Sequence, residues 1–103
     1  MTLKLIATVG DEETQEDAHF PPVGGDTYSI NPDDPKNKFV YVNNKLVLVD
    51  GDQFDAHGTA TLVASTNLLF IGGNAVIRDE DEISHHHSNS GVQAIQNDFV
   101  RCK

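Results

Sequence analysis

The feature that most constrains the fold is an internal repeat. Residues 38–57 align with residues 67–86 at a shift of 29. Residues 5–11 resemble the second half of this unit, and residues 91–100 loosely resemble its first half. Self-similarity at a fixed period is the signature of one supersecondary unit used several times. The chain is therefore expected to contain three copies of one unit, circularly offset along the sequence.

Each copy has the pattern of a β-hairpin. The segments "FVYVNNKLVLV" and "NLLFIGGNAVI" both consist of an apolar run, a two-residue turn and a second apolar run. Asn43-Asn44 and Gly72-Gly73 supply the positive φ angles that primed hairpin turns require. Further β-type runs lie at residues 3–9 and 59–64, whereas helical periodicity is hard to find. The sequence predicts an all-β fold with little or no helix.

The apolar stretches Phe39–Val42 and Leu68–Ile71 are expected to be plain core strands. If a surface for a partner exists, it should involve the ends of these strands and their turns. The acidic stretch Asp11–Asp17 is expected to be a solvated loop. The prolines of residues 31–35 favour a turn-rich insertion over a calcium-binding loop.

The size and composition of the chain predict a single domain, residues 1–103, with a thin core. Apolar residues make up 38% of the sequence and there is no Trp, so the fold is expected to need an additional stabilising link besides its core. A single Cys excludes an internal disulfide, which leaves a metal or a partner chain. The net charge of −9 disfavours nucleic acid and anionic membrane as partners. The first apolar run meets acidic residues at once, which favours synthesis in the cytoplasm without a signal peptide.

Histidines recur at matching places in the repeat. His19, His57 and one residue of the triplet His85-His86-His87 each follow an acidic corner. Copies that surround one axis bring equivalent residues together, and Cys102 would add a fourth donor. Three imidazoles and one thiolate form a closed tetrahedral set, which zinc favours at structural sites. We therefore expect zinc, with iron as the alternative, at about one ion per chain.

The third histidine ligand is left open between His86 and His87. The alignment of the two hairpins at a shift of 29 places His57 opposite His86 and so favours His86. Gly91, the loose counterpart of Gly58, moves the choice towards His87. His87 is preferred because the Ser-Asn-Ser-Gly loop and the strand that returns to Cys102 follow the triplet, and His85 is expected to be a bystander.

The repeated segments resemble those of the Pro-Ala-Ala-Arg (PAAR) repeat proteins. "NKFVYVNNKLVLVDGD" and "STNLLFIGGNAVIRDED" are similar to two copies of the PAAR pattern, and "KLIATVGD" is similar to the tail of another. The tetrapeptide that names the family is absent: its places hold residues 46–49 and 75–78, and only Arg78 retains the basic end. This divergence favours a phage-type member of the family over a standard bacterial secretion one.

The resemblance implies a small cone of three pseudo-threefold β-hairpin repeats with a metal near its point. Such a protein caps and sharpens the trimeric β-helical spike of a contractile phage tail baseplate or a type VI secretion system, and it catalyses nothing. It would be a monomer alone, bind as one tip per spike trimer, and contact the target-cell outer membrane mechanically. It would belong to the virion or be secreted through the contractile apparatus. The implied metal ligands are His19, His57, His86 or His87, and Cys102.

Two other functions fit parts of the sequence. A zinc ion on three histidines with water in the fourth position could serve a hydrolase, with Glu82 or Asp81 as the base. Cys102 would close that position, and the sequence contains no nucleophile elbow or phosphate loop. A small cupin-like or lectin-like binding module would need a cavity, for which short hairpins leave little room.

Overall fold

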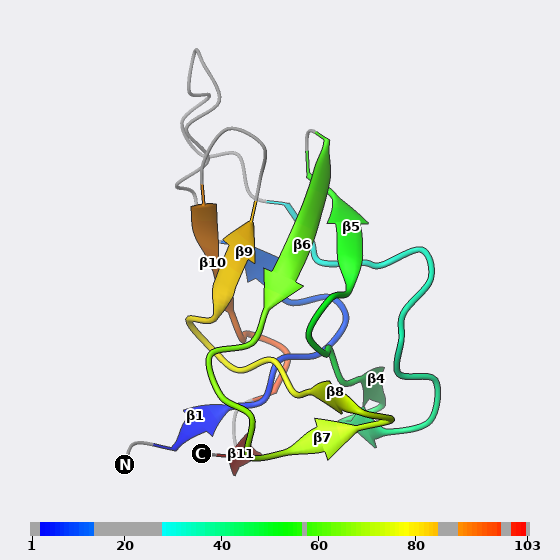
Figure 1. The fold of residues 1–103 in the computed structure, drawn as a ribbon, viewed down its shortest axis with the longest axis vertical. Coiled ribbons are helices and arrows are strands. Elements are labelled where there is room, and N and C mark those ends of the chain that lie inside the picture. The colour runs from blue at the N-terminus through cyan, green and yellow to red at the C-terminus, as the bar shows by residue number, and fades with distance from the viewer. Residues whose placement is uncertain (1–2, 14–27, 57, 85–88, 98–99, 103) are drawn as a thin grey trace.

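The computed structural model describes residues 3–13, 28–56, 58–84, 89–97 and 100–102 (Figure 1). These residues lie in short strands, turns and extended segments. Within the described part of the chain, no helix is long and apolar enough to cross a membrane. The predicted all-β class is confirmed for the described residues.

One curled antiparallel sheet holds the longer strands of the protein (Figure 1). Its strand order is β2 (Glu12–Glu13), β10 (Asn89–Gln93), β9 (Glu82–Ser84), β6 (Thr59–Val63) and β5 (Gln53–Asp55). A bridge between Glu12 and Ser29 continues the sheet beyond β2. We call this part of the molecule the sheet end.

Three two-stranded antiparallel pairs lie at the opposite end, which we call the hairpin end (Figure 1). They are β1 (Lys4–Leu5) with β11 (Arg101–Cys102), β3 (Tyr41–Val42) with β4 (Lys45–Leu46), and β7 (Phe70–Ile71) with β8 (Asn74–Ala75). The predicted turns are confirmed, since Asn43, Asn44, Gly72 and Gly73 all have positive φ. The strands β1 and β11 come from opposite ends of the described chain and pair with each other. They therefore form the third hairpin of the repeat, which the circular offset divides between the two ends of the sequence.

A closed cycle of backbone hydrogen bonds links the three copies between these two ends. The donors and acceptors are Ala7 N to Ile77 O (2.9 Å), Ile77 N to Leu48 O (2.9 Å) and Leu48 N to Ala7 O (3.0 Å). Isolated bridges follow the same order, pairing Ile6 with Arg78, Thr8 with Val47, and Val49 with Val76. Each copy therefore contacts the next one through the same residues of the repeat.

This cycle explains why the predicted long strands are short. The runs at residues 3–9 and 38–49 pair within a hairpin only as far as Leu5 and Leu46. Beyond those residues each run bonds two different copies, one on each of its edges. A strand that changes partner at every residue forms single bridges instead of a ladder.

Three equivalent turns carry the chain from the cycle into the sheet. They are residues 8–11, 49–52 and 78–81, and each ends in a buried aspartate. In each turn the aspartate N donates to the carbonyl of the first residue, and the aspartate carboxylate accepts from the amide of that residue. The third residue has positive φ, and Glu80 (φ 73°) stands where the other two turns have Gly10 (99°) and Gly51 (88°).

The expectation of a solvated loop at Asp11–Asp17 is wrong at its start. Asp11 and Glu13 are fully buried. The Asp11 carboxylate accepts hydrogen bonds from Thr8 N, Ile95 N and Gln96 N, and Glu13 accepts one from the Ser90 hydroxyl. Buried polar groups of this kind persist because they are hydrogen-bonded. Residues 14–17 lie outside the described residues.

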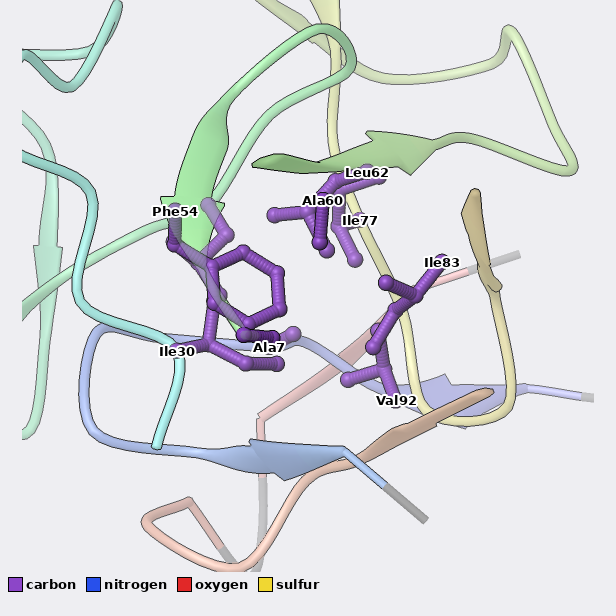
Figure 2. Close-up of a cluster of buried hydrophobic side chains, with 10 residues drawn as sticks. Ala7, Ile30, Phe54, Ala60, Leu62, Ile77, Ile83 and Val92 are labelled. Atoms are coloured by element: carbon purple, nitrogen blue, oxygen red, sulfur yellow. The ribbon is translucent and has the colours of Figure 1, made fainter. Parts of the chain in front are cut away.

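Two apolar clusters form the core. The larger one fills the inside of the sheet and contains side chains from all three copies (Figure 2). Its members are Ala7, Ile30, Leu48, Phe54, Ala56, Ala60, Leu62, Ile77, Ile83 and Val92. The smaller one, which we call the axial cluster, consists of Ile6, Val47 and Val76 at the hairpin end. The three axial residues occupy the same place in the three copies.

The expectation that Phe39–Val42 and Leu68–Ile71 are core strands is wrong. Phe39 is 85% exposed and Leu68 is 59% exposed, while Tyr41 and Phe70 are more than half exposed. The hairpins project from the cycle, so only one side chain of each stretch, Val42 or Ile71, reaches the axial cluster. The apolar runs are therefore mainly surface.

Candidate functional site

An apolar patch covers the hairpin end. The axial cluster lies buried at its centre, and partly buried side chains from all three hairpins pack around it. These surrounding residues are Val42, Ile71, Val100 and Cys102. The exposed side chains of the same region are Phe39, Val40, Tyr41, Leu68, Leu69 and Phe70. Several large apolar side chains exposed at one end of a small protein are typical of an interaction site.

The three hairpins present different residues at one equivalent position. Tyr41 pairs with Leu46 in the first, and Phe70 pairs with Ala75 in the second. In the pair formed by the chain ends, Arg101 takes this position opposite Leu5. Two sides of the hairpin end are therefore aromatic and the third is cationic.

Buried asparagines hold the exposed stretches in place. The Asn37 amide donates to Val40 O (2.8 Å) and Val47 O (3.0 Å), and its oxygen accepts from Phe39 N and Val40 N (both 3.0 Å). Asn97 makes matching bonds, donating to Ile6 O and Val100 O. These bonds fix the backbone of a surface that has little packing behind it. The sequence analysis missed both residues, although each stands three residues before the Val that immediately precedes its hairpin strand.

Cys102 belongs to the hairpin end. It pairs with Lys4 across the sheet and packs against the axial cluster, in the place that Val42 and Ile71 occupy in the other hairpins. Burial raises the pKa of its thiol, against a smaller lowering by Arg78. Its place in the hairpin is therefore that of an apolar packing residue.

The histidines of the predicted metal site, His19, His57, His86 and His87, lie outside the described residues, as does His85. The described residues that flank His57 and the triplet are Ala56, Gly58, Ser84 and Asn89. These neighbours lie at the sheet end, opposite β11 (Figure 1). Among the described residues, no group of three or more His, Cys, Asp or Glu side chains could hold a metal ion. Cys102, in β11, therefore lies at the other end of the molecule from the described residues that flank His57 and the triplet (Figure 1).

The two carboxylates considered as a catalytic base differ in their surroundings. Asp81 is 1% exposed, and its oxygens accept hydrogen bonds from Arg78 N and the Ser65 hydroxyl. Glu82 is exposed on β9, the strand that leads towards the histidine triplet. Asp81 closes a turn, so only Glu82 has the exposure that a base needs.

Comparison with known proteins provides no relative from which a function could be transferred. No protein-family model, no curated protein and no solved structure matches the chain. A functional proposal therefore depends on the repeat, on the resemblance of its segments and on the geometry of the described residues.

Proposed function

We propose that the protein is the tip of a membrane-piercing spike. In this proposal the chain forms a cone of three pseudo-threefold hairpin units, and it caps a trimeric β-helical spike in a contractile phage tail or a type VI secretion system. The observation that carries the proposal is the cyclic bonding of Ala7, Leu48 and Ile77, which relates three parts of one chain. A single chain with three similar sides can match a partner with true threefold symmetry.

The hairpin end is the proposed docking base. Its apolar patch needs a partner to cover it, and the strand ends of a β-helical trimer need backbone partners of their own. The three hairpins offer the partner three similar edges around the axial cluster. Docking at this end leaves the sheet end as the point.

The proposed role is mechanical and does not involve catalysis. A point has to keep its shape under load although its core is thin. The closed cycle of backbone bonds and the three buried aspartates supply rigidity that does not depend on side-chain packing. In the machine the protein would be a virion component or would leave the cell through the contractile apparatus.

A metal would strengthen the point further. We propose that His19, His57 and either His86 or His87 bind one zinc ion, or iron as the alternative, because the described neighbours of His57 and the triplet share the sheet end. Zinc on protein nitrogen ligands links distant chain segments and contributes folding energy. The place of Cys102 against the axial cluster favours a ligand set without it.

The second candidate function is a small zinc-dependent hydrolase. The position of Cys102 favours it, because three histidines without the thiolate leave a coordination position for water. Glu82, exposed on β9, would be the base. The cyclic bonding of the copies and the apolar hairpin end have no role in this candidate, so the spike tip remains the first proposal.

Metal content separates the proposed ligand sets. Protein purified without added metal should contain about one zinc or iron ion per chain. The variant His57→Ala should lose most of the metal and melt several degrees lower, since metal binding and folding are coupled. Cys102→Ser should keep the metal, because its thiol lies at the hairpin end. Metal loss in Cys102→Ser would restore Cys102 to the ligand set, and wild-type protein without metal would contradict the site.

The spike proposal is tested by assembly. Co-expression with a trimeric β-helical spike protein from the same genome should give a complex whose mass corresponds to one tip per three spike chains, while the isolated tip should be a monomer. Tyr41→Ser combined with Phe70→Ser should weaken the complex. Val63→Ser, an exposed apolar residue of the sheet, is the matched control and should not. Failure to bind the spike, together with metal-dependent turnover of a substrate, would favour the hydrolase.

A further inference from the structure

Charge is separated along the molecule. The segments that build the hairpin end contain Lys and Arg but no carboxylate; they are residues 3–8, 38–49, 66–78 and 100–102. The described segments that follow the first residue of each turn and form the sheet contain many carboxylates but no Lys or Arg; they are residues 9–13, 28–30, 50–56, 58–64, 79–84 and 89–96. The loop of residues 31–37 belongs to neither group and carries Asp33, Asp34 and Lys36. A chain with a net charge of −9 therefore has one end that is locally cationic.

Two of the cations at the hairpin end are available to a partner. Lys4 forms an ion pair with Glu80 (3.2 Å), Lys38 forms one with Asp34 (3.0 Å), and Arg78 is 8% exposed. Lys45 and Arg101 are exposed and form no ion pair with any described residue. Among the described cations of the hairpin end, those that are neither paired nor buried thus lie on the hairpins β3–β4 and β1–β11.

The positions of these cations place them at the rim of the apolar patch. Lys45 is paired directly with Val42, and side chains of directly paired residues share one face of a sheet. Val42 packs against the axial cluster, so Lys45 lies at the edge of that cluster. Arg101 precedes Cys102, and successive side chains of a strand point to opposite faces, so Arg101 lies on the outer face of its hairpin. It takes the register position of the exposed Tyr41 and Phe70, at the outer side of the apolar patch. An apolar centre with a charged rim is the usual anatomy of a protein interface.

We propose that the hairpin end docks on an acidic surface: the blunt end of the spike trimer presents apolar residues at its axis and carboxylates at its rim, facing Lys45 and Arg101. This inference rests on the proposed function, because the spike is the occupant. Opposite charges across an interface speed association and fix orientation. The hairpin β7–β8 carries Phe70 and Asn74 at the corresponding positions, so one of the three identical spike chains meets an uncharged side.

A spike end fits this surface better than an anionic membrane does. A membrane is a broad anionic surface, and the acidic sheet end and the net charge of −9 would oppose its approach. A protein end contacts only the small patch, and charges more than about 8 Å away are screened at physiological salt.

The experiment measures the affinity of the full-length tip for the purified spike trimer at low and high salt. Lys45→Gln and Arg101→Gln should each weaken binding about two- to fivefold at low salt, and the loss should disappear at high salt. Lys36→Gln is the matched control, since it removes one exposed cation from the loop beside Asp33 and Asp34 and outside the hairpin end. It should leave the affinity unchanged.

The outcomes separate this inference from the proposed function. Spike binding that is insensitive to salt and to Lys45→Gln and Arg101→Gln would overturn the acidic interface and leave the spike-tip function standing. Absence of spike binding would overturn both. Vesicles of phosphatidylcholine with phosphatidylserine test the membrane as the alternative partner. If the protein binds these vesicles and not the spike, and if this binding depends on Lys45 and Arg101, the surface binds a membrane and the inference is overturned.

Discussion

Asp11→Asn is expected to lower the free energy of unfolding by about 2 to 4 kcal/mol. The Asp11 carboxylate is fully buried and accepts from Thr8 N at 2.6 Å with one oxygen and from Ile95 N and Gln96 N at 2.8 and 2.7 Å with the other. An asparagine has one acceptor oxygen, so its NH2 group would face at least one buried backbone donor. Denaturant unfolding at neutral pH measures the difference.

The control for this variant is Glu82→Gln. It makes the same change of charge at an exposed position of β9. Surface changes of this kind usually alter stability by less than about 0.5 kcal/mol. Equal losses in the two variants would mean that charge, and not the hydrogen bonds of the turn, explains the result for Asp11.

The pKa of Asp11 adds a pH dependence with a definite sign. Burial raises the pKa of this carboxyl above its usual 3.8, although the backbone bonds from Thr8, Gln96 and Ile95 lower it in part. The folded chain therefore binds this proton more readily than the unfolded chain, and the contribution to stability is full below 3.8 and is lost as pH rises through the folded pKa. The stability difference between wild type and Asp11→Asn should grow on acidification. An NMR titration midpoint for the Asp11 carboxyl carbon at or below 3.8 would contradict this.

The sequence predicted the hairpins and their turns because these features are local. Asn43-Asn44 and Gly72-Gly73 demand positive φ whatever surrounds them, and the structure has it. The exposure of the hairpin strands was predicted wrongly, because burial depends on what lies across the fold. The run Phe39–Val42 has the composition of a core strand, yet only Val42 reaches the axial cluster.

The candidate site was predictable in part, because the positions of turns are local features of the sequence whereas the burial of side chains is not. The repeat identified the turns of the hairpin end as the region for a partner, and their exposure is consistent with that. The burial of Asp11, Asp52 and Asp81 was not predicted, because three acidic turns in an acidic chain look like solvated loops. Their spacing did carry a signal: each stands three residues after a position that bonds the next copy, and a recurring residue at a fixed offset indicates a structural role.

The role of Cys102 as a metal ligand stays a prediction, whereas its place in the fold is described. Three histidines and one cysteine suggest a complete zinc site, but the set says nothing about where the chain ends fold. The pairing of Lys4 with Cys102 joins the two termini at the hairpin end. The repeat contained this information, since Cys102 takes the place of Val42 and Ile71, which are apolar packing residues.

Ile77→Ala is expected to lower the free energy of unfolding by about 2 to 5 kcal/mol. Ile77 is fully buried in the larger cluster, and truncation leaves a cavity that the bonded cycle of residues 7, 48 and 77 cannot close. The control is Ile95→Ala, at a side chain that is 55% exposed, for which a loss below about 0.5 kcal/mol is expected. Thermal or denaturant unfolding measures both.

The same site tests whether the three copies share one axis. Ala7 takes the place of Ile77 in another copy, and both side chains belong to one cluster. Ala7→Ile alone should overpack that cluster and lower stability by about 1 to 3 kcal/mol. Combined with Ile77→Ala it restores the volume around the axis, so the double variant should lose less than the sum of the single losses, with a coupling of about 1 kcal/mol or more. Strictly additive losses would mean that the two positions do not pack against each other, and the cyclic arrangement of the copies would lose its support in the core.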